Sequence, residues 1–343
     1  MAESRRPRLV DVAQRAGVSP RTVSNVLHDH PHIRASTRKK VEEALVELDY
    51  RVNLSARALA GRSTGFIALV LPVLDNPYFS SLAAHVIEAC AARDWTVLIE
   101  QTAAQEDRER NAVFGPASRL VDGVILQLDA IDEEELSSRF AHSNLVLIGE
   151  EATASSADHV AVDNISAARE ATEHLLSLGR KRIATAGILS SGLNTTSELR
   201  YRGVSQAVEA AGLTVQAQHV IEVGNFRRPD GAAAGERLLE LEELPDAVVC
   251  YNDLIASGVL ARLREAGVSV PDEVAVVGFD DNEESRFMAP PLTTIAWDME
   301  AIAQRCVDQL HERWRPGGEF QPPSRTFVNH ELIIRESTAK AQG

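Results

Sequence analysis

The sequence predicts a small helical head followed by a large α/β body with two lobes. The chain of 343 residues is longer than one hydrophobic core usually organises, since domains run to about 100–200 residues. Its charge is divided unevenly: residues 1–62 hold 12 Lys and Arg against 7 Asp and Glu, a net charge of +5, and the remainder carries −20. Beyond residue 62, short apolar runs alternate with amphipathic stretches, as in βαβ units with a parallel sheet.

The composition limits the class of protein. Apolar residues make up 44% and charged residues 25%, which is ordinary for a globular protein and excludes a disordered or collagen-like chain. Cys90, Cys250 and Cys306 are odd in number and far apart, so we expect buried thiols in a reducing cytoplasm rather than disulfides. We find no signal peptide and no membrane-spanning run, which also predicts a cytoplasmic protein. The net charge of −15 argues against a polyanion partner for the chain as a whole. The basic head, considered alone, can still bind a polyanion.

Residues 10–27 predict two short helices around the turn Gly17-Val18-Ser19. Ser19 is a good N-cap, and Pro20 suits the first position of the second helix. Four polar side chains without a carboxylate fall on the outer face of that helix: Arg21, Ser24, Asn25 and His28. Such a face offers the donors that a recognition helix needs in the major groove of DNA. An ordinary helical hairpin is the alternative.

A third predicted helix begins near Ser36, which we expect to cap it. Its first turn carries Arg38, Lys39 and Lys40, although cations at a helix N-terminus oppose the helix dipole. A bound phosphate would reverse that cost, so we predict that this end docks on a DNA backbone. The alternative is a solvated charged turn.

Residues 53–61 predict a short hinge helix, which Asn53 begins and Gly61 ends. A helix of about two turns is marginal in water, so it needs DNA or a partner to form. Leu59, presented beside Arg57, suits insertion between minor-groove base steps. A packed connector between head and body is the alternative.

These segments together are similar to one family. Residues 9–27 resemble the helix-turn-helix of LacI-family transcriptional regulators, as do residues 37–41, 48–50 and 53–61, and the resemblance covers essentially the whole chain. It implies that Pro20, Arg21 and Asn25 read the major groove and that Leu59 kinks the central base step. It also implies a homodimer on a pseudo-palindromic double-stranded operator. We predict the following DNA-binding residues: Pro20, Arg21, Ser24, Asn25, Arg38, Asn53, Arg57 and Leu59.

The body shows the alternation directly. Apolar runs predict strands at the following segments: Phe66–Leu71, Thr96–Ile99, Gly123–Leu128, Leu145–Ile148, Ile183–Gly187, Ala247–Tyr251 and Val274–Phe279. The resemblance implies that the body, residues 63–343, is a pair of doubly wound lobes with a periplasmic-binding-protein-like (type I) fold. We expect the first lobe at about 63–163 and 297–324, and the second at about 164–296 and 325–336. An effector would bind in the cleft between them, beyond the strand C-termini.

Polar and aromatic residues follow several predicted strands and match the effector motifs of the family. The predicted effector-binding residues are Tyr78, Phe79, Gln127, Thr196, Arg200, Phe226, Asn252, Asp280 and Trp297. Carboxylates, amides and arginine suit sugar hydroxyls while aromatic rings cover the apolar sugar face; a planar purine or nucleoside suits the same rings and remains an alternative. Structural readings also stay open: Asp253 and Asp281 as helix caps, Phe79 as core, and Arg200 with Asp280 as ion pairs.

Two other function classes fit less well. The pair Asp280-Asp281 suggests a hydrolase, but no G-x-S-x-G, P-loop, H-E-x-x-H or G-x-G-x-x-G motif accompanies it. The histidines of residues 28–32 lack a distant metal ligand. A sugar-transport receptor would have no use for the basic head. We therefore predict an effector-responsive repressor, most simply of carbohydrate-use genes, with no enzymatic activity, cofactor or metal. It would be a dimer, because no heptad helix follows the last strand.

Overall fold

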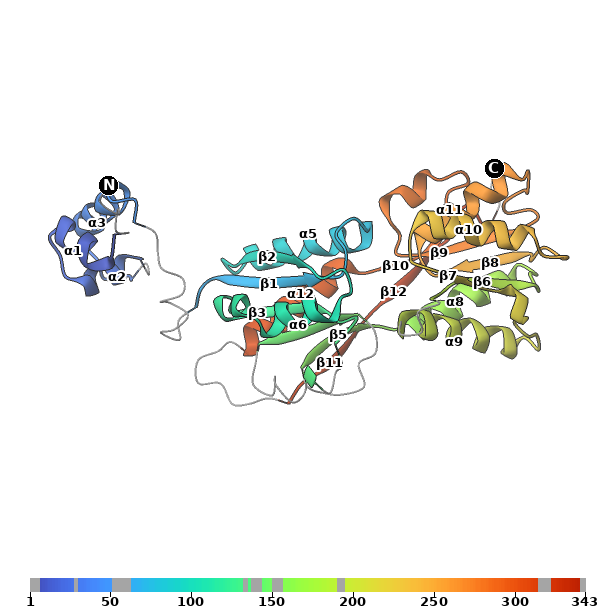
Figure 1. The fold of residues 1–343 in the computed structure, drawn as a ribbon, viewed down its shortest axis with the longest axis horizontal. Helices are drawn as coiled ribbons and strands as arrows, with labels where there is room; N and C mark the ends of the chain where they lie inside the picture. Colours follow the sequence, from blue (N-terminus) through green and yellow to red (C-terminus); the bar gives the residue numbers. More distant parts are fainter. Residues whose placement is uncertain are drawn as a thin grey trace. The chain divides into compact units, whose positions relative to one another are not determined.

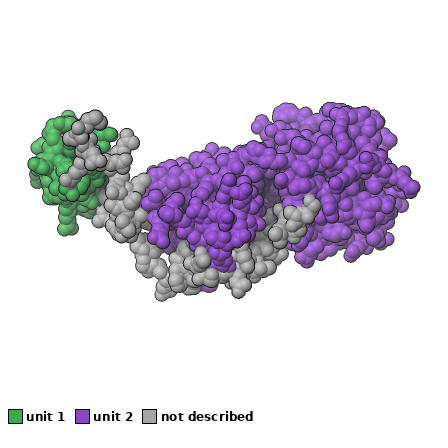
Figure 2. All heavy atoms as spheres, viewed as in Figure 1, with its two compact units in different colours: residues 1–62 green, residues 63–343 purple. Residues whose placement is uncertain are grey.

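A computed structural model of the protein describes the following residues: 7–27, 30–50, 63–131, 135–136, 144–149, 157–189, 195–313 and 322–339. The chain divides into two units, residues 1–62 and 63–343 (Figure 2). The first unit carries a net charge of +5 and the second a net charge of −20.

The described part of the first unit, residues 7–27 and 30–50, contains the helices α1 (Leu9–Ala16), α2 (Pro20–Leu27) and α3 (Ala35–Glu47). They pack around a small core that includes Val12, Val23 and Val41. Ser19 caps α2 as predicted, because its Oγ accepts a hydrogen bond from the backbone N–H of Thr22 at 3.1 Å.

The predicted cap of the third helix is wrong. Ser36 lies inside α3, and Arg34 occupies the N-cap position without a side-chain capping bond. Arg34 has an extended backbone, and its carbonyl accepts from the N–H groups of Thr37 at 2.9 Å and Arg38 at 3.0 Å. The helix therefore starts at Ala35, before the residue with the better capping side chain.

The first lobe of the second unit is a six-stranded parallel sheet in the order β11-β5-β4-β3-β1-β2 (Figure 1). Its strands are β1 (Phe66–Leu71), β2 (Thr96–Gln101), β3 (Gly123–Gln127), β4 (Leu145–Gly149), β5 (Asp158–Val162) and β11 (Arg325–Val328). Its helices are α5 (Pro77–Ala91), α6 (Glu106–Phe114) and α12 (Met299–Arg313), with a short 3-10 turn, η1 (Pro116–Leu120). The central strands β3, β4 and β5 are fully buried, as expected for a sheet covered on both faces.

The second lobe repeats this plan in the order β12-β10-β9-β8-β6-β7. Its strands are β6 (Ile183–Leu189), β7 (Val220–Val223), β8 (Ala247–Cys250), β9 (Ala275–Phe279), β10 (Thr293–Trp297) and β12 (His330–Ile333). Helices α8 (Asn164–Ser177) and α9 (Thr195–Ala210) cover one face, and α10 (Arg228–Leu239) and α11 (Asp253–Glu265) cover the other (Figure 1). Two 3-10 turns, η2 (Ala217–His219) and η3 (Glu283–Phe287), complete it. Only β12 is antiparallel to its neighbour.

The chain passes between the lobes at Val162–Asn164, Trp297–Met299 and Val328–His330. The third crossing corrects the predicted lobe boundary. We expected residues 325–336 in the second lobe, but Arg325–Val328 pair in parallel with β5 of the first sheet. Asn329 alone separates β11 from β12, so one short stretch of chain, residues 325–333, supplies a strand to each of the two sheets (Figure 1).

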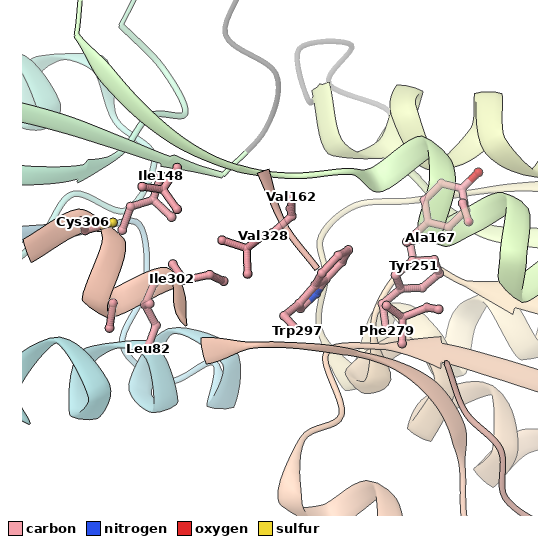
Figure 3. Close-up of a cluster of buried hydrophobic side chains, with 14 of the residues drawn as sticks. Leu82, Ile148, Val162, Ala167, Tyr251, Phe279, Trp297, Ile302, Cys306 and Val328 are labelled. Carbon is pink, nitrogen blue, oxygen red and sulfur yellow. The ribbon is translucent and has the colours of Figure 1, made fainter. Parts of the chain in front are cut away.

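A buried apolar cluster continues from one lobe into the other. Figure 3 shows Trp297 between Val328, which belongs to the first sheet, and Phe279 and Tyr251 of the second lobe. The three cysteines are buried free thiols, as the sequence predicts. Among the helices of the described residues, we find no stretch long and apolar enough to cross a membrane.

His159 on β5 gives the body a measurable response to acid. Burial and, next, the nearby positive charge of Arg325 lower the pKa of His159 to about 4. Below pH 6.5 the unfolded chain takes up a proton that the folded chain refuses, so the free energy of unfolding falls by roughly 3 kcal/mol between pH 6.5 and 4. Urea unfolding followed by tryptophan fluorescence at pH 7 and pH 4 should show that the wild type loses about this much more stability on acidification than His159→Gln, because other groups that titrate in this range act equally on both proteins. A variant with the same pH slope as the wild type would contradict the assignment.

Candidate DNA interface and effector site

The outer face of α2 carries the predicted base-reading residues. Val23 and Val26 are buried against α1 and α3, which leaves Pro20 and Arg21 exposed and Ser24 and Asn25 half-buried on the other side. The helix contains no carboxylate. The side of α2 that faces away from the core therefore carries side chains with hydrogen-bond donors.

The start of α3 carries three consecutive basic residues. Arg38, Lys39 and Lys40 occupy this end, and the first turn holds no acidic residue. Lys39 and Lys40 are exposed and Arg38 is half-buried. The predicted hinge residues Asn53, Arg57 and Leu59 lie outside the described residues.

In the body, Arg200 of α9 is the centre of a buried polar and aromatic cluster. Its guanidinium Nε donates to Asn164 Oδ1 at 2.8 Å, and Nη1 donates to the backbone carbonyl of Tyr251. The guanidinium carbon lies 4.3 Å from the centroid of the Phe279 ring and 5.9 Å from that of Trp297. These contacts fix a positive charge beside two aromatic rings.

Asp280 lies next to this arginine, directly after β9. Its carboxylate accepts a hydrogen bond from Trp297 Nε1 at 3.4 Å, and its backbone φ is +105°. Burial raises the pKa of Asp280, while the Arg200 charge and the indole N–H act in the opposite direction. A residue held in the left-handed region costs of order 1–3 kcal/mol, which the surrounding structure must offset. Strain, burial and a charged partner together mark this carboxylate as a candidate binding group.

Asp253 supports the loop that carries Asp280. Its Oδ1 accepts from Thr294 Oγ1 at 2.6 Å, and its Oδ2 accepts from Ser285 Oγ at 2.6 Å and Asn282 N at 2.9 Å. Burial and the neighbouring Asp280 charge raise the pKa of this carboxyl. Asp253 and Asp281 do not act as helix caps, because Asn252 and Asn282 occupy the cap positions of α11 and η3. Asp253 instead accepts the three hydrogen bonds given above, and Asp281 pairs with Arg335 at 2.6 Å.

The remaining predicted residues lie in several places. Tyr78 and Phe79 begin α5 and meet edge to face with their centroids 5.0 Å apart. Phe226 lies between β7 and α10, and its carbonyl accepts from Asn252 Nδ2 at 3.2 Å. Asn252 also caps α11 through Ile255 N at 2.8 Å, so internal bonds occupy both ends of its amide. Two further predicted residues, Gln127 at the end of β3 and Thr196 in α9, are buried.

Three contacts of this region could not be predicted from the sequence. Phe279 was predicted only as the end of a strand, although its ring stacks on the Arg200 guanidinium. Asn164 was not considered, because its partner lies 36 residues further along the chain. Arg227 and Asp75 form an ion pair at 2.9 Å that joins the two lobes. No local motif indicates these contacts, because each joins residues that lie far apart in the sequence.

A surface hollow of about 250 Å³ opens at the start of α8. Asp163, Asn164 and Arg169 line it together with Leu199 and Phe327. None of the nine predicted effector residues lines this hollow. Among the described residues, no group of three His, Cys, Asp or Glu side chains is placed to hold a metal ion.

Known proteins resemble the chain along nearly its whole length. The model of the bacterial regulatory proteins of the lacI family matches residues 8–53, and that of the periplasmic binding protein-like domain matches residues 172–338. The transcriptional repressor PurR of Haemophilus influenzae (strain PittEE) is 33% identical over 333 residues, which cover 95% of this chain and 97% of that protein.

Two solved structures extend the likeness to the fold. The transcriptional regulator CelR in complex with cellobiose is 29% identical and has a TM-score of 0.72, covering 97% of this chain and 100% of that one. The lac repressor dimer bound to operator and an anti-inducer is 25% identical with a TM-score of 0.81, covering 97% of this chain and 99% of that one. With its helix-turn-helix head and its two-sheet body, the chain belongs to the LacI family of DNA-binding transcriptional repressors.

Proposed function

We propose that the protein represses transcription from a pseudo-palindromic operator and that a small carbohydrate bound in the body switches its affinity for DNA. The observation that carries the effector proposal is the cluster of Arg200, Asp280 and Trp297. Charged hydrogen-bonding groups beside an aromatic ring suit a sugar, whose hydroxyls need donors and acceptors and whose ring face is apolar. The cellobiose complex of a 29% identical regulator supports this choice.

The switch would act as a population shift. A sugar that binds one arrangement of the lobes more tightly than the other favours that arrangement, and the operator favours one of the two in turn. The cluster includes Arg200 of α9, Asp280 directly after β9 and Trp297 at the end of β10. Because β10 leads directly into a crossing between the lobes, a bound sugar would favour one conformation of that crossing.

A homodimer is part of the proposal. The edge strand β2 exposes Leu98 and Ile99, and α5 beside it exposes Ile87. Exposed apolar side chains on an edge strand favour association. The operator-bound relative is a dimer. Two copies of this chain would place one head on each half of an operator, and we propose that they do so in the cytoplasm.

The decisive experiment is calorimetry with a panel of mono- and disaccharides, including cellobiose and sucrose, alongside purine bases and nucleosides. We expect one sugar to bind the wild type and to change its affinity for an operator selected from random DNA by about 5- to 150-fold. Asp280→Asn and Arg200→Met should lose the sugar, because each removes a charge from the cluster.

Two controls separate the two halves of the molecule. Arg21→Ala should lose operator selectivity by about 1–3 kcal/mol and keep its affinity for the sugar. Glu173→Gln, an exposed change on α8, should leave both activities unchanged. Binding of a nucleoside in place of a sugar would establish the alternative effector class, and a wild type that binds nothing in the panel would refute the sugar proposal.

A further inference from the structure

Asn164 and Arg200 join two helices of the second lobe through their side chains. Asn164 is the first residue of α8, and its Oδ1 accepts the Arg200 Nε–H of α9 at 2.8 Å. Both side chains are almost completely buried, with 1% of Asn164 and 6% of Arg200 exposed. A buried bond between an amide and a guanidinium is directional, so it determines how the guanidinium is turned.

The packing of the two helices brings these groups within reach of one another. Gly203 lies three residues beyond Arg200 on α9, and a Cβ at this position would overlap the carbonyl oxygen of Ile165 and lie 2.8 Å from Ala168 Cβ. The helices therefore make backbone contact at this level. A side chain at residue 203 would force them apart and lengthen the distance between Arg200 Nε and Asn164 Oδ1.

We propose that Asn164 is a positioning residue for the effector, because it fixes the orientation of the Arg200 guanidinium. Three contacts define that orientation: Asn164 at Nε, the Tyr251 carbonyl at Nη1, and the Phe279 ring at 4.3 Å on one face. A guanidinium that is already held in place binds a ligand more tightly than a mobile one, since less conformational freedom is lost on binding. This inference rests on the proposed effector function of Arg200.

The amide suits the task better than a carboxylate would. Asn164 accepts the Nε–H without adding a negative charge, so the positive charge of Arg200 is left to act on Asp280, where it opposes the rise in pKa that burial causes. The anchor is itself well held, because Asp163 caps α8 through the N–H of Ser166 at 2.8 Å. Because its side chain is uncharged and its backbone is held by the helix cap, Asn164 can orient Arg200 without competing with the effector for the positive charge.

The test compares Asn164→Leu, which keeps the volume and removes the acceptor, with Asn164→Asp, which keeps an acceptor oxygen. With the panel sugar that binds the wild type most tightly, we expect Asn164→Leu to weaken affinity about tenfold or more. Asn164→Asp keeps the acceptor but adds a charge that competes for Arg200, so it should weaken affinity by only about threefold. Thr172→Val, another buried polar change on α8, is the matched control and should leave affinity unchanged. If Asn164→Leu does not fold, Asn164→Ser, whose hydroxyl is too short to reach Nε, takes its place.

Two readouts distinguish positioning from general packing. Adding Asn164→Leu to Arg200→Met should cause no further loss of affinity, because the group to be positioned is already gone. Nitrogen-15 NMR should show the Arg200 Nε–H of the sugar-free protein in slow exchange with water in the wild type and Asn164→Asp, and in fast exchange in Asn164→Leu. An unchanged Nε–H signal and unchanged affinity in Asn164→Leu, or equal losses in the Leu and Asp variants, would overturn the inference. A wild type that binds no panel compound refutes the effector proposal instead.

Discussion

Replacing Gly187 with alanine is expected to lower the free energy of unfolding of the body by about 3 kcal/mol or more. Gly187 on β6 has a φ of +144°, which side chains with a Cβ rarely adopt. A Cβ there would overlap the side chain of Tyr251, lying 2.6 Å from its Cδ2, and Tyr251 is fully buried. The carbonyl of Gly187 also accepts from Ser197 Oγ at 2.9 Å, so the change would disturb the start of the helix that carries Arg200.

Urea unfolding followed by tryptophan fluorescence measures this loss, because all three tryptophans of the chain lie beyond residue 62. Gly212→Ala is the matched control: Gly212 also has a positive φ, at +72°, but a Cβ there meets nothing within 4 Å. It should lose about 1 kcal/mol, the cost of backbone strain alone. Equal losses at the two positions would show that contact with Tyr251 is unimportant.

Replacing Asp253 with leucine is expected to cost about 3–5 kcal/mol, because it leaves three buried donors without an acceptor. These donors are the hydroxyls of Thr294 and Ser285 and the N–H of Asn282, which come from β10, η3 and the loop before it. Removing one donor with Ser285→Ala should cost only about 1 kcal/mol. Urea unfolding of the full chain compares the two variants, and similar losses would argue against a shared acceptor.

The same carboxyl predicts a dependence on pH. Burial and Asp280 raise the pKa of Asp253 above its unfolded value, so the folded chain holds a proton that the unfolded chain releases. This contribution to the free energy of unfolding therefore falls as the pH rises above about 4. Asp253→Asn should show a shallower fall than the wild type, and parallel pH profiles would contradict the raised pKa.

Local pattern predicted the elements of the body closely. The run Phe66–Leu71 coincides with β1, and Val274–Phe279 begins one residue before β9. Such runs are local signals, because a strand buried on both faces must be apolar along its whole length. The C-terminal strands were different: residues 325–336 were expected in one lobe, although Arg325–Val328 and His330–Ile333 belong to two sheets. Which sheet pairs with a strand depends on partners far away in the sequence.

The sequence by itself determined the helical head, the α/β body and the residue types of the candidate site, because turn chemistry, hydrophobic period and charge are properties of neighbouring residues. Only the tertiary structure decided which of those residues are in contact with each other. It brings Phe279 and Asn164 to Arg200, and it places Asn252 at a helix cap. These are distances between segments tens of residues apart, which depend on how closely helices such as α8 and α9 pack, and no local pattern records them.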